Sequence, residues 1–229
     1  MRLSSFLRRN GVIARCLAGA ALLAAAGCAS TRVGLREDMS GKQYFLPTNF
    51  HGEARLPADL RRVILLPVFG GAIVPPETAA TLEEVFATEL QKEMRFEVVR
   101  LSRTDCQMRF GAAEFSSTSV LPHDFLATLG REYAADAVLF VDLTAYQPYR
   151  PLTLGVRSKL ATIEQTRLVW TFDEIFSADD PAVGNSVRHY YGSTDSAGIP
   201  HETGQGALQS PSKFAAYVAA ATFNTLPPR

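Results

Sequence analysis

Histidines and acidic side chains are the first places to look for chemistry, because they supply general bases and metal ligands. The four histidines are His51, His123, His189 and His201, and none has the spacing of an HExxH zinc motif. Metal-binding residue types adjoin one another at Asp179-Asp180 and His201-Glu202. Solvated loop residues are the simpler interpretation of both pairs. The sequence therefore names no catalytic residue, metal site or cofactor site.

A glycine pair follows the first long apolar run, and such a pair can present backbone N–H groups to an anion. Gly70-Gly71 lacks both the GxGxxG pattern and the GK[ST] ending of phosphate loops. The serines offer no GxSxG nucleophile motif either. A tight turn is the simpler interpretation of the pair, with an anion cradle as the alternative.

One late run combines arginine with tyrosines, the residue types that dominate protein-binding hot spots. Arg188, Tyr190 and Tyr191 lie within residues 177–210, a stretch rich in Gly, Asp and Ser. The same run, 187–191, also fits a short edge strand that packs its aromatic rings on the core. With both interpretations open, these three residues form a candidate partner patch.

The N-terminal residues have the composition of an export signal. Four arginines and no acidic residue precede an apolar run over 16–26. That run is far shorter than the roughly 20 residues that cross a bilayer. We therefore predict a signal peptide over residues 1–27.

The small residues that end at Gly27-Cys28 resemble a bacterial lipobox, in which a peptidase cuts before a cysteine that carries diacylglycerol. This resemblance makes Cys28 the first mature residue and the lipid attachment site. Ala25 departs from the pattern, which has Leu more often at that position. Ala29, rather than Asp, after the cysteine resembles lipoproteins sent to the outer membrane. Ordinary secretion after the A-x-A site at 24–26 is the alternative, and it leaves Cys28 a free thiol.

Charge and cysteine content narrow the classes further. The chain is formally neutral, but removing the four leader arginines from 23 basic residues leaves 19 against 23 acidic ones. The longest basic cluster outside the leader is the pair Arg61-Arg62, so we exclude nucleic acid as a partner. Cys16 leaves with the leader and Cys28 is modified, so only Cys106 remains and no intramolecular disulfide forms. About 200 mature residues suffice for one core.

Apolar runs and amphipathic stretches alternate from residue 61 onward. Continuous apolar runs predict strands over 63–68, 96–101 and 136–143. Apolar residues that recur every three or four positions predict helices over 75–94, 122–135 and from 211. We predict one α/β domain over 61–229: a mixed sheet of about five strands in the order βαβαβ, an antiparallel hairpin and a C-terminal helix. Residues 28–60 are the lipidated N-terminus and tether, with 44–50 aromatic enough to pack on the domain.

The hairpin is the one region where apolar and polar residues alternate. Leu154, Val156, Leu160, Leu168, Trp170, Phe172 and Phe176 alternate with Arg157, Lys159, Thr171 and Asp173. Alternation of this kind predicts antiparallel strands with one face on the core and one face in water.

This element order resembles the periplasmic domains of curli-secretion lipoproteins, penicillin-binding-protein activator lipoproteins and the N-terminal domain of the Tol-system propeller protein. The resemblance rests on 63–68, 134–139 and 168–170, and the long loop after Phe176 departs from it. Members of that group are non-enzymatic. The resemblance therefore implies a protein at the outer membrane, facing the periplasm, that binds envelope proteins.

Three functional interpretations follow. The first is a binding or scaffold module, such as an activator of a peptidoglycan synthase. The second is a subunit of an oligomeric secretion assembly, and the third is an envelope hydrolase with its site in 177–210. The identity of the partner and the oligomeric state stay open at this stage.

Overall fold

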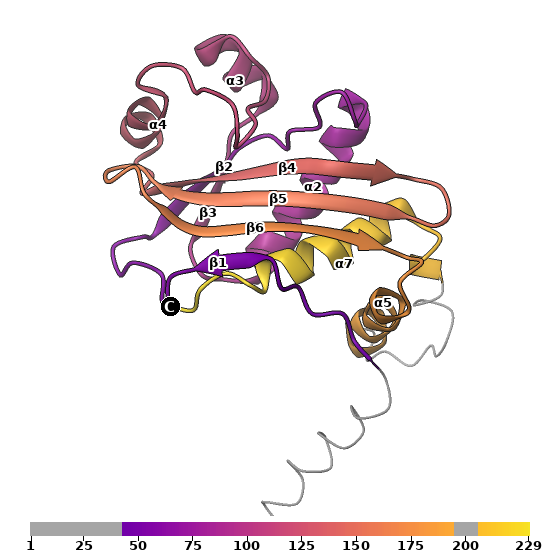
Figure 1. Cartoon of the computed structure of the whole chain (residues 1–229). Helices are drawn as coiled ribbons and strands as arrows, with labels where there is room; N and C mark the ends of the chain where they lie inside the picture. Colours follow the sequence, from indigo (N-terminus) through magenta and orange to yellow (C-terminus); the bar gives the residue numbers. More distant parts are fainter. Residues whose placement is uncertain (1–42, 195–205) are drawn as a thin grey trace, which may run out of the picture. The chain divides into compact units, whose positions relative to one another are not determined.

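The computed structural model describes residues 43–194 and 206–229, and their compact unit spans Tyr44–Arg229. Within it lies one six-stranded mixed sheet in the order β1-β6-β5-β4-β2-β3 (Figure 1). The strands are β1 (Phe50–Gly52), β2 (Arg62–Leu65), β3 (Glu97–Arg100), β4 (Ala137–Gln147), β5 (Thr153–Thr162) and β6 (Leu168–Ser177). The predicted α/β class, mixed sheet and hairpin are confirmed.

The helices are α2 (Pro76–Lys92), α3 (Arg103–Phe110), α4 (Phe125–Tyr133), α5 (Pro181–Thr194) and α7 (Pro211–Phe223). Proline at its first position opens α2, with Glu77 in the first turn and Lys92 in the last, as the helix dipole favours. Ser102 caps α3 by accepting a hydrogen bond from the Asp105 N–H. No helix within the described ranges is long and apolar enough to cross a membrane.

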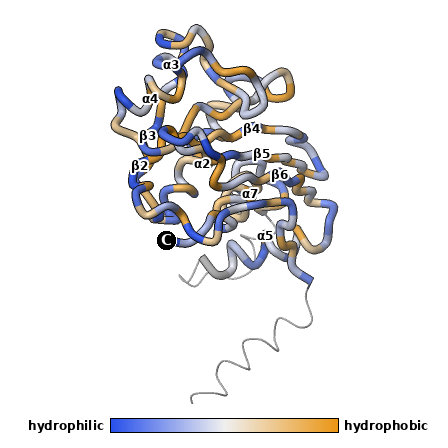
Figure 2. The backbone as a smooth tube through the Cα atoms, turned by 60° about the vertical axis from the view of Figure 1, so that its left-hand side comes forward, coloured by the Kyte–Doolittle hydropathy of each residue, from blue (hydrophilic) through white to orange (hydrophobic). Residues whose placement is uncertain are grey.

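Strand β2 lies inside the sheet and pairs in parallel with both β3 and β4. Helix α2 connects β2 to β3, whereas α3 and α4 connect β3 to β4. Val63 and Leu65 face one cluster of buried side chains, and Ile64 and Leu66 face the other. Burial on both faces explains why this strand is a continuous apolar run, which can be followed in Figure 2.

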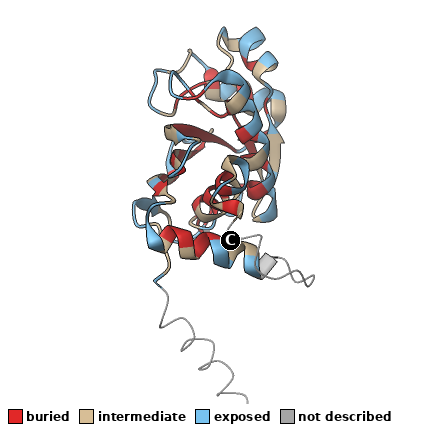
Figure 3. Ribbon diagram, turned by 90° about the vertical axis from the view of Figure 1, so that its right-hand side faces the viewer, coloured by how far each residue is buried: buried red, intermediate tan, exposed pale blue. Residues whose placement is uncertain are grey.

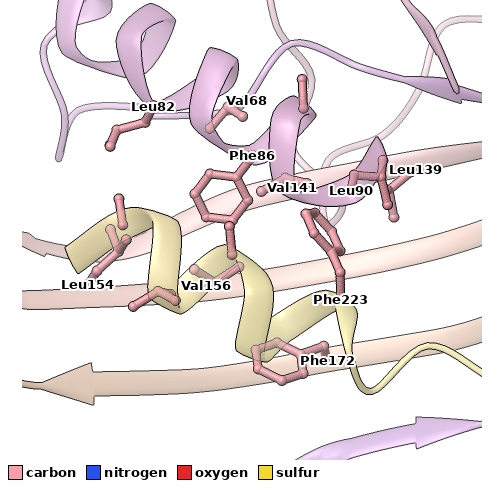
Figure 4. Close-up of a cluster of buried hydrophobic side chains, with 14 of the residues drawn as sticks. Val68, Leu82, Phe86, Leu90, Leu139, Val141, Leu154, Val156, Phe172 and Phe223 are labelled. Atoms are coloured by element: carbon pink, nitrogen blue, oxygen red, sulfur yellow. The ribbon is translucent and has the colours of Figure 1, made fainter. Parts of the chain in front are cut away.

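Helices α2, α5 and α7 pack on one face of the sheet, which we call the covered face. Phe86 from α2 meets Phe223 from α7 edge-on, with ring centroids 5.9 Å apart. Figure 4 shows the Phe86 ring between α2 and α7, with Val141 and Val156 from the sheet in the same cluster. This cluster holds most of the buried apolar side chains, and Figure 3 shows the buried sides of the helices turned inward.

The opposite face of the sheet is divided. Helices α3 and α4 and the loop 111–124 cover it over β2, β3 and β4, where Ile64, Val138 and Phe140 are buried. No described helix covers the same face of β5, β6 and β1 (Figure 1). We call this part the open face. Most of its side chains are polar and partly exposed, as the alternation predicted, and Ile175 on β6 is an exposed apolar exception.

Three segments differ from the sequence-based expectation. Residues 187–191 lie in α5, so the predicted edge strand is wrong: Asp180 accepts the Ala182 N–H at 2.8 Å, Pro181 opens the helix, and the apolar side of the helix is buried. The stretch 102–119, expected to be a loop, contains α3. The irregular lead-in contains the three-residue β1.

The lead-in before β1 packs on the domain, as its aromatic content predicted. The Phe45 ring lies 5.1 Å from that of Phe176. The Phe45 N–H donates to Ser186 Oγ at 2.9 Å. The compact unit thus includes residues ahead of the first long strand.

Candidate functional site

Strands β5 and β6 carry the polar side chains of the open face. Lys159 stands opposite Thr171, and Arg157 opposite Asp173. Side chains alternate across a strand, so these four residues point away from the covered face. Leu168, predicted to face the core, is instead 50% exposed, because the register shifts between Leu160 and Ala161.

Strand β1 completes this surface from the other side of β6. His51 stands opposite Thr171, and the Asp173 N–H donates to the Asn49 carbonyl at 3.0 Å. Two rows of three side chains therefore cross three strands. We call them the polar grid: Lys159, Thr171 and His51 in one row, and Arg157, Asp173 and Asn49 in the next.

The polar grid lines a shallow hollow of about 330 Å³, together with Phe50 and Phe172. Phe50 and Phe172 stand opposite each other across β1 and β6, and their side chains point to the covered side, where Phe172 stacks with Trp170 and Phe176. The side chains that face the hollow are therefore those of the polar grid.

Fixed hydrogen bonds orient the two cations of the grid. Asp173 accepts the Arg157 Nε–H at 2.7 Å. Lys159 Nζ donates to the Ser117 carbonyl at 2.9 Å, and Ser117 is itself tied to the buried Asp142 through its N–H and its hydroxyl. Both charged groups are held before any ligand arrives.

A second hollow of about 300 Å³ lies beside the start of β4 and the turn between β5 and β6. Two of its charged groups, Asp136 and Arg167, already have partners. Asp136 accepts the N–H groups of Arg61 and Arg62, each at 2.8 Å, and Arg167 pairs with Glu53. These contacts are structural, so the polar grid is the better candidate site.

The glycine pair after β2 forms a tight turn and also holds an anionic group, so both interpretations of its sequence apply. Gly71 has a φ of +55° in a tight turn, and the N–H groups of Gly70 and Gly71 donate to the Glu114 carboxylate at 3.3 and 3.1 Å. Arg103 pairs with the same carboxylate. The cradle thus holds an anion from this chain, which fastens the loop 111–124 to the end of β2.

Arg103 also lies 3.2 Å from the Glu83 carboxylate. Burial raises the pKa of Glu83 above its usual value, although Arg103 opposes that shift. The Cys106 thiol is buried nearby, and its burial raises its pKa to about 11. A thiol with so high a pKa stays protonated at neutral pH and is a poor nucleophile.

The candidate patch lies on α5, where the two tyrosines hold the helix in place. The Tyr190 hydroxyl donates to Glu89 at 3.0 Å, and the Tyr191 hydroxyl donates to the Lys213 carbonyl at 2.7 Å. Both rings pack against the large cluster of the covered face. Arg188 is exposed and donates to Asn185 at 3.2 Å, so the three residues do not form one outward surface.

The remaining sequence candidates are scattered. His123 is exposed beside Asp124, and the His189 ring lies 5.2 Å from that of Tyr44. Asp180 caps α5, whereas Cys28, His201 and Glu202 lie outside the described residues. Within 43–194 and 206–229, no three His, Cys, Asp or Glu side chains are grouped to hold a metal ion.

Sequence reasoning placed four of the six grid residues on the wet face of the hairpin, because the hairpin alternates, but it did not propose them as a site. It missed Asn49 and His51, since a strand of three residues gives no periodic signal and is defined only by its pairing with β6. The capping residues Ser102 and Gly111 could have identified α3, and Asp180-Pro181 could have identified α5.

No family model and no curated protein matches the chain. Among solved structures it is similar to the PelC dodecamer from Paraburkholderia phytofirmans, with a TM-score of 0.42 and 11% identity over 79% of this chain and 96% of that one. Lipoprotein GNA1162 from Neisseria meningitidis has a TM-score of 0.38 and 13% identity, over 60% of this chain and 99% of that one. The LpoB C-terminal domain from Salmonella enterica has a TM-score of 0.35 and 10% identity, over 51% and 82%. TM-scores this low do not indicate a shared function.

Proposed function

We propose that this chain is an outer-membrane lipoprotein, anchored through Cys28, whose domain is a non-catalytic binding or scaffold module for envelope proteins in the periplasm. An activator of a peptidoglycan synthase is one such module. The leader, the Gly27-Cys28 junction and Ala29 support the anchor and its direction. Nucleic acid has no role in this proposal.

The half-covered sheet is the observation that carries the binding function. On the open face, which no described helix covers, Arg157 and Lys159 are oriented by Asp173 and by the Ser117 carbonyl around a hollow. Held polar groups around a hollow fit recognition of a partner.

Site-specific photo-crosslinking in cells tests this function. A photoreactive residue replaces Thr171 in the polar grid, and in a matched control it replaces Thr81, which is exposed on α2. We expect an envelope protein to be crosslinked from position 171 and not from position 81. Capture of a second copy from 171 would favour a subunit of an oligomeric assembly. Equal capture from both positions, or none from 171, would refute the open face as the partner surface.

The anchor has its own test. Cys28→Ser should move the protein from the outer-membrane fraction to the soluble fraction and remove the mass of the acyl chains. If the variant still sediments with the outer membrane, and its mass shows that no acyl chains were lost, Cys28 is not the anchor.

The patch on α5 is proposed as a second contact surface, with Arg188 as its exposed member and Tyr190 and Tyr191 as its support. Arg188→Ala should weaken partner capture without changing the thermal midpoint. Tyr190→Phe should lower the midpoint, because it removes the hydrogen bond to Glu89. Unchanged capture by Arg188→Ala would remove the patch. Turnover of an envelope substrate that His51→Ala or His189→Ala abolishes would overturn the non-catalytic assignment.

A further inference from the structure

The polar grid has more hydrogen-bond donors than acceptors. Lys159 and Arg157 are donors only, and Thr171, His51 and Asn49 can each donate. Asp173 is the one group that only accepts, and Arg157 already occupies part of its capacity. The buried Asp142 carboxylate stands opposite Arg157 on β4, so the two cations have two carboxylates near them, of which only Asp173 lines the hollow. The surplus of donors among the residues that line the hollow therefore points to an anionic ligand.

Both cations retain donors that the described residues do not use. Arg157 gives its Nε–H to Asp173 and lines the hollow, and a guanidinium carries four further N–H donors. Lys159 gives one of three N–H bonds to Ser117. Because these side chains are already oriented, a ligand would meet them with little loss of rotamer freedom.

The grid also distinguishes between kinds of anion. The planar guanidinium of Arg157 matches a carboxylate with two parallel hydrogen bonds. A phosphate monoester carries nearly two charges, so the Asp173 carboxylate would repel it more strongly than a singly charged carboxylate. Asp173 can in addition accept an amide N–H, which a peptide supplies beside its carboxylate and a bare anion does not.

We propose that the polar grid binds a carboxylate-bearing peptide segment of an envelope partner. In this arrangement Arg157 and Lys159 hold the carboxylate, Asp173 accepts a peptide N–H, and Thr171 and His51 border the chain. This inference rests on the proposed binding function and names the chemistry of its ligand. A hollow of about 330 Å³ accommodates one acidic side chain with its adjoining peptide groups.

The test uses the full chain purified in detergent and two fluorescent peptides, acetyl-Ala-Asp-Ala-Glu-Ala-amide and its Asn/Gln counterpart, which differ only in charge. Fluorescence anisotropy at low salt gives the affinity. We expect the acidic peptide to bind at least about tenfold more tightly than the uncharged one. Arg157→Gln and Lys159→Gln should each weaken the acidic peptide about tenfold, and excess inorganic phosphate should compete poorly.

The matched control is Lys213→Gln, which makes the same change of charge on α7, on the covered side of the sheet. It should leave affinity unchanged. Equal binding of both peptides, equal loss in Lys213→Gln, or displacement by phosphate at the concentration of the acidic peptide would each refute the ligand class. Crosslinking from position 171 would still succeed if only the ligand class were wrong, and would fail if the binding function were wrong.

Discussion

The covered face and the open face of the sheet differ in what their side chains contact. On the covered face, α2, α5 and α7 come from distant parts of the chain and meet in one large apolar cluster. On the open face, the same strands present side chains fixed by ion pairs and hydrogen bonds around a hollow. Because hydrophobic burial supplies most of the folding free energy, stability depends mainly on the covered face. The open face contributes little to this burial.

The part of the sheet under α3, α4 and the loop 111–124 combines apolar burial with polar contacts. Its apolar cluster is small, and polar contacts fasten its loop at two places: Glu114 to the glycine pair, and Asp142 to Ser116 and Ser117. The sheet therefore has three regions: the covered face, the part under α3 and α4, and the open face. Substitutions in them should differ in how much they lower the free energy of unfolding.

The largest effect is expected on the covered face. Phe86→Ala removes a fully buried ring that packs edge-on against Phe223. It should lower the free energy of unfolding by about 5 kcal/mol, the upper end for a buried Phe. Urea unfolding followed by circular dichroism measures this. A loss under about 1 kcal/mol would contradict the assignment of the core.

A smaller loss is expected in the cluster under α3 and α4. Phe140, in the centre of β4, is 5% exposed and packs with Ile64 and Val138. Phe140→Ala should cost about 3 kcal/mol, because a smaller cluster collapses around the cavity more readily. The same urea experiment applies. If Phe140→Ala costs as much as Phe86→Ala, the two clusters do not differ as described.

Asp142→Asn tests the polar fastening of the loop. The carboxylate accepts the Ser117 N–H and the hydroxyls of Ser116 and Ser117, and an amide would present N–H donors to some of these groups. We expect a loss of about 2 kcal/mol and faster proteolysis within 111–124. Ser119→Ala, in the same loop, is the control. Unchanged proteolysis would show that other contacts hold the loop.

The smallest effect concerns α5 at high pH. Burial, with the nearby Glu89 carboxylate, raises the pKa of Tyr191 to about 12, whereas an unfolded tyrosine titrates near about 10. The folded state therefore retains the proton that the unfolded state loses, and stability falls as pH rises from about 10 to about 12. Tyr191→Phe should reduce this dependence of the urea midpoint on pH. An identical dependence in wild type and variant would contradict it.

The sequence predicted those parts of the fold whose pattern is local. The run 63–68 identified β2 because the strand is buried on both faces, and the hairpin alternation identified the wet side of β5 and β6. The same alternation placed Leu168 inward, and only the register shift after Leu160 turns it out. A bulge depends on pairing between strands, which a single strand does not display.

The errors have a similar cause. Residues 187–191 contain aromatic and branched side chains typical of strands, yet Asp180 and Pro181 start a helix whose tyrosines bind Glu89 and Lys213. Tertiary contacts here override local propensity. The candidate patch was chosen by composition, and composition does not distinguish tyrosines that hold a helix from tyrosines that meet a partner.

The position of strand β1 in the chain bears on when the hollow forms during folding. It comes first among the strands of the chain, but it pairs only with β6, and Asn49 and Asp173 are 124 positions apart in sequence. Three residues cannot form a stable strand alone, and closing so long a loop is slow. We therefore expect β1 to join last, after the hairpin exists. Asn49 and His51 would then complete the hollow only on a fully folded chain.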